Sequence, residues 1–289
     1  MELCNEIVIR GLLERHGFRF SRSMGQNFLI DPSIPAAIAE ASGADEGCGV
    51  LEIGPGIGPL TQELAKRAGK VVSIELDRAL LPVLAETVGD LPNVEIVPGD
   101  ALRLDLEGLI AEKFQGLTPM VCANLPYNIT TPVLTKLAGI PSLTALTVLI
   151  QKEAAQRFTA PQGSPEIGAF PLQLQYRMET ELLFDVEPEC FLPRPKVTST
   201  VLRCVRRQRP AVAVRDEALF QKVLKGAFLL RRKTLSNSLA SALPGFSKEE
   251  VQAAIQACGL PATVRGEALS LAEFAALTEA LAEARGEIP

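Results

Sequence analysis

The chain has 289 residues with 34 acidic and 29 basic side chains, which gives a net charge of −5, and its length leaves room for two domains. Its six cysteines include no Cys-x-x-Cys pair and His16 is its only histidine, so a zinc site or a Ser-His-Asp triad is not expected. The N-terminus lacks a basic region followed by a long apolar run, and no later apolar stretch is long enough to span a membrane, so we expect a soluble cytoplasmic protein.

The N-terminal segment, residues 4–18, carries apolar side chains at helical spacing among charged ones, which predicts an amphipathic helix. Arg19 and Arg22 follow, just before Gly25. One interpretation is a surface arm that precedes the first sheet element. The other is a flexible lid, which needs glycine for mobility and cations for contact with phosphate. Composition alone does not decide between the two.

A glycine-rich turn follows the first strongly apolar strand. Residues 50–53 are an apolar run, Gly54, Gly56 and Gly58 alternate after it, and residues 60–68 have apolar side chains at helical spacing. This order predicts a strand, a tight turn and a helix. Glycines in such a turn let the backbone approach a ligand closely, and the helix directs its free N–H groups at the same place. The element is therefore predicted to hold a small molecule.

The spacing of these glycines argues against two common ligands. A dinucleotide fingerprint needs its third glycine three residues after the second, whereas Gly58 comes two residues after Gly56 and Pro59 follows it. A phosphate-binding P-loop needs Gly-Lys-Ser/Thr at its end, and this turn contains no cation. We therefore expect neither NAD nor a polyphosphate.

The next two strands each lead to an acidic residue. Residues 71–74 end at Glu75, whose carboxylate suits the two hydroxyls of a ribose, and residues 94–97 lead to Asp100, which could accept from an adenine amino group. Ribose and adenine without phosphate suggest S-adenosylmethionine. The alternative is that both acids only cap helices.

A fourth apolar strand, residues 120–123, ends in Asn124-Leu125-Pro126-Tyr127. At this point the sequence resembles the S-adenosylmethionine-dependent methyltransferases that act on exocyclic amines. An amide carbonyl and a backbone carbonyl that accept from an adenine NH2 favour its nucleophilic form, and Tyr127 could stack on a flipped base. The alternative is a turn that begins at Asn124 and ends in a buried tyrosine.

Three more stretches narrow the resemblance: residues 23–29, residues 149–153, and residues 191–197, which read Phe-Leu-Pro-Arg-Pro-Lys-Val. With them, the chain from about Arg19 to its end is similar to the ribosomal RNA adenine dimethyltransferase family, in its small-subunit branch. The resemblance favours the lid interpretation and implies that Asn124, Leu125 and Pro126 hold the target amine while Tyr127 and Phe191 stack on the base. It implies a cofactor site for S-adenosylmethionine lined by Gln26, Asn27, Leu29, Gly54, Gly56, Glu75, Leu76, Asp100, Ala101 and Asn124.

The whole pattern predicts an α/β fold followed by helices. Strand-like and helical runs alternate over residues 45–205, which is typical of a parallel sheet covered on both faces, and residues 182–186 and 198–205 could form an antiparallel pair at one edge. The resemblance implies a Rossmann-like sheet of seven strands. We expect a catalytic domain with its N-terminal arm in residues 1–205 and a helical RNA-recognition domain in residues 206–289. The helices expected in the second domain cover 217–230, 232–242, 248–258 and 271–284, with capping boxes at Ser247 with Glu250 and Ser270 with Glu273.

Charge is distributed unevenly between these domains. Residues 206–289 carry a net charge of +3 and the remainder −8. Overall acidity is unusual for an RNA-binding protein, so local clusters must supply the contacts. The cations expected to contact RNA are Arg19, Arg22, Arg194, Lys196, Arg231, Arg232 and Lys233. The alternative for each cluster is a solvated surface.

The resemblance implies an enzyme that dimethylates N6 of two adjacent adenines in a hairpin loop near the 3′ end of small-subunit (16S) ribosomal RNA, within a partly assembled (pre-30S) particle. We expect it to act as a monomer, without a metal and without a membrane. Two alternatives stay open. One is a large-subunit adenine methyltransferase of the macrolide-resistance type, and the other is an RNA-binding assembly factor without catalysis.

Overall fold

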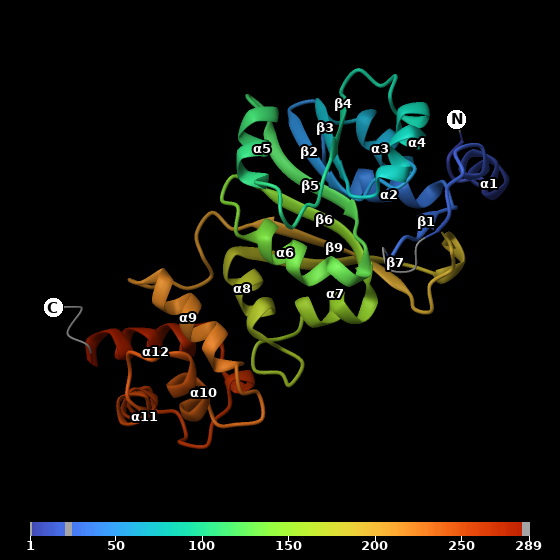
Figure 1. The fold of residues 1–289 in the computed structure, drawn as a ribbon. Helices are drawn as coiled ribbons and strands as arrows, with labels where there is room; N and C mark the ends of the chain where they lie inside the picture. The colour runs from blue at the N-terminus through green and yellow to red at the C-terminus, as the bar shows by residue number, and fades with distance from the viewer. Residues whose placement is uncertain (1, 21–24, 285–289) are drawn as a thin grey trace. The chain divides into compact units, whose positions relative to one another are not determined.

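The computed structural model describes residues 2–20 and 25–284. The chain divides into two compact units (Figure 1). The first contains residues 1–155 and 180–206, and the second contains residues 156–179 and 207–289. No helix among the described residues is both long enough and apolar enough to cross a membrane.

The first unit is built on a seven-stranded sheet with the order β4-β3-β2-β5-β6-β9-β7 (Figure 1). The strands are β2 (Cys48–Ile53), β3 (Lys70–Glu75), β4 (Val94–Pro98), β5 (Thr118–Asn124), β6 (Ala145–Gln151), β7 (Met178–Val186) and β9 (Ser199–Arg206). The first five in this order pair in parallel, and β9 pairs antiparallel with β6. The predicted α/β fold with a seven-stranded sheet is therefore confirmed.

The sequence of β2 explains its central place. All its residues are buried, as expected for a parallel strand covered on both faces. It lies between β3, which follows it in the chain, and β5, which the chain reaches only after crossing back from β4, so the strand order reverses between β2 and β5. Ligands of open α/β sheets bind in the crevice at such a switch point, beyond the carboxyl ends of the strands.

Short helices precede and connect the strands of this unit. They are α1 (Glu6–Arg15), α2 (Ser33–Ala41), α3 (Pro59–Ala65), η2 (Arg78–Leu80), α4 (Leu81–Thr87), α5 (Leu106–Lys113), η3 (Tyr127–Ile129), α6 (Thr130–Ala138), η4 (Pro188–Cys190) and α7 (Lys152–Phe158), which runs into the second unit from residue 156. Ile38 of α2 and Leu60 and Leu64 of α3 pack into one apolar cluster with the strands. The predicted N-terminal helix is present as α1, and its Ile9, Leu12 and Leu13 are buried.

A separate two-stranded sheet joins distant parts of the chain. β1 (Phe28–Leu29) pairs antiparallel with β8 (Phe191–Leu192), so that Phe28 lies opposite Leu192 and Leu29 opposite Phe191. The backbone N–H of Ile30 also donates to the carbonyl oxygen of Cys190 at 2.8 Å. This pairing holds residues 25–29 beside the main sheet.

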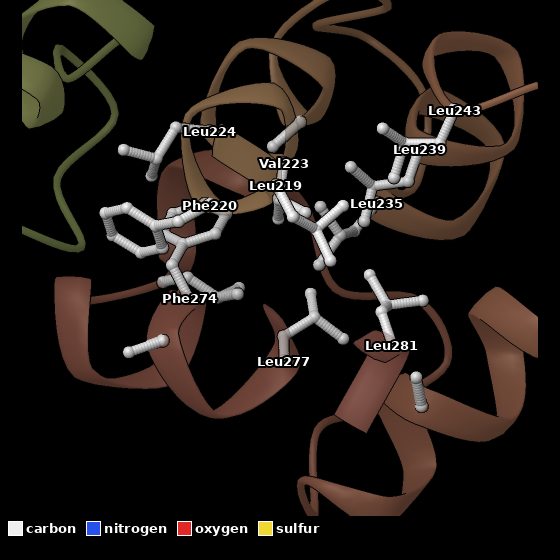
Figure 2. Close-up of a cluster of buried hydrophobic side chains, with 14 of the residues drawn as sticks. Leu219, Phe220, Val223, Leu224, Leu235, Leu239, Leu243, Phe274, Leu277 and Leu281 are labelled. Carbon is white, nitrogen blue, oxygen red and sulfur yellow. The ribbon is translucent and has the colours of Figure 1, made fainter. Parts of the chain in front are cut away.

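The second unit is helical, with α8 (Ala169–Arg177), α9 (Glu217–Ala227), α10 (Leu235–Ala242), α11 (Lys248–Ala257), η5 (Gly266–Ala268) and α12 (Leu271–Ala284). Its core is an apolar cluster that contains Phe220 from α9, Leu239 from α10 and Phe274 from α12 (Figure 2). Both expected capping boxes form: each serine hydroxyl accepts the backbone N–H of its glutamate, and each glutamate accepts the backbone N–H of its serine.

The unit boundary differs in one respect from the expected division at 205/206. Residues 156–179 belong with the C-terminal helices, because Ile167, Leu172 and Tyr176 are buried in their core. The ring centroids of Tyr176 and Phe220 are 4.8 Å apart. The sequence pattern predicts this segment only as part of the alternating strands and helices of residues 45–205, so it does not indicate which core α8 joins.

The two helices expected at 217–230 and 232–242 are shorter than predicted. α9 ends at Ala227 and α10 begins at Leu235, so residues 228–233 form a turn. Two hydrogen bonds replace helical ones there: the N–H of Leu229 donates to the carbonyl oxygen of Gly226 at 3.2 Å, and the N–H of Leu230 donates to Ser238 Oγ at 2.9 Å.

Candidate functional site

A pocket opens at the carboxyl ends of the central strands of the first unit. It is lined by residues 25–29, 52–56, 59–60, 74–77, Leu80, 99–101 and 124–129. All ten residues expected in the cofactor site line it, as do Leu125, Pro126 and Tyr127. Residues as far apart in the chain as Gly25 and Ile129 therefore meet here.

The glycine turn forms the floor of this pocket. Gly54, Gly56 and Gly58 all have positive φ angles, of 71°, 62° and 92°, which a side chain disfavours. Space is also short at two of them, since a Cβ on Gly56 would lie 3.1 Å from the ring of Phe28 and one on Gly58 would lie 2.7 Å from Val88. The turn is thus held against its neighbours with its backbone facing the pocket.

Glu75 ends β3 at the pocket wall and is almost completely buried. Burial raises the pKa of its carboxyl group to about 7, while backbone N–H groups, including that of Asp77 at 2.7 Å, oppose the rise. The carboxylate form is a strong acceptor for a pair of hydroxyl groups. Leu76, the next residue, is half exposed at the pocket rim.

The loop that carries Asp100 is held in place by a lysine of another element, α6. The carboxylate of Asp100 accepts the N–H of Leu102 at 2.9 Å. Lys136 of α6 donates from Nζ to the carbonyl oxygens of Ala101 at 3.0 Å, Leu102 at 2.9 Å and Leu104 at 2.6 Å. One ammonium group therefore donates hydrogen bonds to three backbone carbonyl oxygens of the loop that contains Asp100 and Ala101. No motif signals Lys136, because a lysine on an amphipathic helix is usually a surface residue.

Asn124 ends β5 and points its amide toward residues 25–29. Its Nδ2 donates to the backbone carbonyl oxygen of Asn27 at 3.2 Å, and Asn27 Nδ2 donates to that of Gly25 at 3.2 Å. The protein thus uses the donor side of the Asn124 amide. Its Oδ1 is the acceptor that an exocyclic amine could use.

Tyr127 begins η3 and is anchored at its hydroxyl group. Its OH and the Ser199 hydroxyl are hydrogen bonded at 2.6 Å. Ser199 is fully buried at the start of β9. Burial raises the pKa of Tyr127, so its phenol stays neutral. The hydrogen bond fixes the outer end of the side chain and thereby the axis along which the ring lies.

Glu52 is a pocket residue that the sequence analysis did not single out. It lies in β2 just before the glycine turn, and its carboxylate accepts from the hydroxyls of Thr61 and Ser73, both at 2.6 Å. These bonds join β2, α3 and β3 beneath the pocket. Burial raises its pKa to about 7, and the charge of Glu75 adds to the rise. An acid inside an otherwise apolar strand is the signal that could have identified it.

Phe191 does not line the pocket. Its side chain is 2% exposed and packs in the apolar cluster that contains Leu29, Val186 and Val201. The stacking role expected for it stays a prediction that requires its ring to become accessible.

The cations expected to contact RNA are exposed where the structure describes them. Arg19, Lys196, Arg232 and Lys233 lie at the surface, and Arg22 is outside the described residues. Arg194 forms an ion pair with Glu189, and Arg231 donates to the carbonyl oxygen of Pro165 at 2.6 Å. Within the described part of the chain, no group of three or more His, Cys, Asp or Glu residues could hold a metal ion.

Known proteins resemble this chain over nearly its whole length. Residues 17–283 match the family model described as ribosomal RNA adenine dimethylase. Ribosomal RNA small subunit methyltransferase A of Geobacillus thermodenitrificans is 44% identical over 275 residues, which cover 93% of this chain and 94% of that protein. The protein of the same name from Streptococcus sanguinis is 45% identical and covers 97% of this chain, with 98% of its own length matched.

Two solved structures agree with the fold. The 23S rRNA methyltransferase ErmE matches with a TM-score of 0.64 and 27% identity, over 88% of this chain and 99% of its own. A dimethyladenosine transferase from Plasmodium falciparum matches with a TM-score of 0.71 and 22% identity, over 86% of this chain and 95% of its own. The similarity to the Plasmodium falciparum structure supports the fold alone.

Proposed function

The chain belongs to the ribosomal RNA adenine dimethylase family, and we propose that it uses S-adenosylmethionine to dimethylate N6 of two adjacent adenines in a hairpin loop near the 3′ end of small-subunit ribosomal RNA. Relatives named for the small subunit are 44% and 45% identical to it, whereas ErmE, named for 23S rRNA, is 27% identical. These identities favour the small subunit over the large one. We further propose a cytoplasmic monomer that acts on a partly assembled small subunit.

The observation that carries the proposal is the meeting of Glu75, Asp100 and Asn124 in one pocket at the carboxyl ends of β3, β4 and β5. The residues fit the cofactor: Glu75 would accept from the ribose hydroxyls, Asp100 would accept from the adenine amino group, and Gly54 and Gly56 line the same pocket without side chains. S-adenosylmethionine, when bound, supplies a methyl group on a positively charged sulfur that leaves as a neutral thioether. The protein then has mainly to align the nucleophile with that methyl group.

The amine would be held by Asn124 Oδ1 and one backbone carbonyl. The carbonyl oxygen of Pro126 already accepts from the N–H of Ile129 at 3.2 Å and the hydroxyl of Thr130 at 3.3 Å. A carbonyl oxygen has two lone pairs, so the Leu125 carbonyl is the better second acceptor. Two acceptors that draw on the N6 hydrogens favour a pyramidal nitrogen, whose lone pair can attack.

Contact with RNA would come from Arg19, Arg22, Arg194 and Lys196 in the first unit and from residues 231–233 in the second. Exposed cations support this assignment because phosphate contacts dominate affinity for nucleic acids. Tyr127, anchored by Ser199, would stack on the target base.

The test is a methylation assay with labelled S-adenosylmethionine, which offers small-subunit particles and large-subunit RNA from cells that lack the modifications. We expect dimethyladenosine in the small-subunit RNA only. Asn124→Ala should lower transfer by roughly 100- to 1,000-fold, as loss of a positioned catalytic hydrogen-bonding group does, while cofactor binding persists. Label in the large-subunit RNA would overturn the substrate assignment. Binding of small-subunit RNA without transfer would instead favour a non-catalytic assembly factor.

A further inference from the structure

The turn at residues 228–233, between α9 and α10, exposes two neighbouring leucines. The side chains of Leu229 and Leu230 are 58% and 39% exposed. Of the large hydrophobic side chains described in the second unit, only these two are exposed, while the others are buried or partly buried. A single exposed leucine needs no explanation, but a pair at the tip of a turn is a small apolar surface that solvent alone does not favour.

The backbone of this turn is held in place from inside the unit. Ser238, fully buried in α10, accepts the N–H of Leu230 at 2.9 Å and donates to the carbonyl oxygen of Gly226 at 2.7 Å. The N–H of Lys233 donates to the carbonyl oxygen of Leu230 at 2.8 Å, which closes the turn. The leucines are therefore presented by an ordered backbone, and a partner that binds them pays little entropy to fix it.

Cations flank the two leucines in the chain. Arg231, Arg232 and Lys233 follow directly and are exposed, and Lys222 and Lys225 are exposed on α9. None of these five residues forms an ion pair with a described residue, whereas Arg177, Arg207 and Arg215 in the same unit all do. Five cations without acidic partners repel one another and favour an anionic partner.

We propose that Leu229 and Leu230 form an apolar wedge of the RNA interface, which contacts base or sugar faces while the surrounding cations hold phosphates. The wedge rests on the proposed function, since it takes RNA as the partner. Leucine side chains are used as wedges at nucleic-acid surfaces, and the minor groove of an RNA helix is wide and shallow enough to admit them. The charges beside the leucines favour RNA, a polyanion, over a protein partner.

The experiment separates apolar from ionic contact by salt dependence. Binding of the full chain to small-subunit ribosomal RNA without proteins is measured at several salt concentrations for the native sequence, for Leu229→Ala with Leu230→Ala, and for Arg231→Ala with Arg232→Ala. We expect the leucine pair to weaken binding by about 10-fold or more, from lost apolar burial, with an unchanged salt slope. The arginine pair should lower the slope by about 1 to 2, because each phosphate contact contributes nearly one unit.

Two controls keep the result interpretable. Leu182→Ala changes another leucine that is 39% exposed, in β7, and should leave RNA binding unchanged. Thermal unfolding of the leucine pair should match that of the native sequence, because both side chains are exposed.

Three outcomes would contradict the wedge or its premise. Unchanged RNA affinity of the leucine pair would remove the wedge. Unchanged affinity for bare RNA with weaker binding to particles that contain ribosomal proteins would assign the leucines to a protein partner. Failure of the native sequence to bind small-subunit RNA or particles at all would count against the proposed function itself.

Discussion

Replacing Lys136 by methionine tests how the pocket loop is held. Methionine keeps the length and apolar part of the side chain but removes the ammonium group that donates to the carbonyl oxygens of Ala101, Leu102 and Leu104. The helix α6 should form as before, since methionine is a good helix former. The change therefore acts on the loop behind Asp100.

The expected cost follows from three hydrogen bonds with one charged donor. Each such bond contributes about 1.5–3 kcal/mol, but the three share one group, and water can reach a half-buried site after the ammonium is lost. We therefore expect Lys136→Met to lower the free energy of unfolding by about 2–3 kcal/mol, well below the sum. Because Asp100 and Ala101 line the pocket, S-adenosylmethionine should bind about 10-fold more weakly, which corresponds to about 1.4 kcal/mol.

Urea unfolding and titration calorimetry measure the two effects. Lys66→Met is the matched control, because Lys66 is an exposed lysine whose ion pair with Glu63 on α3 should contribute less than about 1 kcal/mol. If Lys136→Met unfolds at the same urea concentration as this control and binds the cofactor as tightly, the three hydrogen bonds do not position the loop.

Three further predictions concern the same pocket. Burial raises the pKa of Glu75 to about 7, so the carboxylate fraction increases as pH rises through 7, and S-adenosylmethionine should bind more tightly at pH 8 than at about pH 6. The Glu75→Gln variant should bind the cofactor weakly at every pH. An affinity of the native protein that does not change with pH would contradict the ribose assignment. The pKa of Glu52 is about 7 in the folded protein and about 4.5 in the unfolded chain. Its contribution to the stability of the ligand-free protein should therefore fall as pH rises between those two values. Thermal unfolding of the Glu52→Gln variant should lack this part of the pH dependence. The Tyr127→Phe and Ser199→Ala variants should each bind a fluorescent adenine analogue more weakly by stacking. The double variant should lose less binding free energy than the sum of the two single losses, because both changes remove the same hydrogen bond of about 1 kcal/mol. Additive losses would show that this bond does not orient the ring.

Most of the sheet could be predicted because its strands are short apolar runs that end in recognisable residues. Glu75, Asp100 and Asn124 follow such runs, and parallel strands bring their carboxyl ends to one edge. The positions of these three side chains in one pocket follow from that rule. The ends of α9 and α10 could not be predicted, because the hydrogen bond from Leu230 to Ser238 depends on the packing of two helices.

The supporting residues of the site escaped prediction for a related reason. Lys136 and Ser199 act through partners that are 32 to 72 positions away in the chain, and nothing in their immediate neighbours distinguishes them from a surface lysine and a strand serine. Phe191 shows the converse. Its motif is recognisable, but whether its ring faces a ligand or the core is decided by the register of β1 with β8.

The position of α8 in the chain, well before the helices that it packs against, has a consequence for synthesis at the ribosome. Ile167, Leu172 and Tyr176 emerge before α9, α10, α11 and α12, whose side chains complete their core. Residues 178–216 must be made first, which takes on the order of 2–8 s at 5–20 residues per second. During that interval the apolar side of α8 is a nascent-chain surface without its native cover. A chain that stops at Arg206 would keep that surface uncovered permanently, so deletion of the C-terminal helices should produce an aggregation-prone fragment unless residues 156–179 are removed with them.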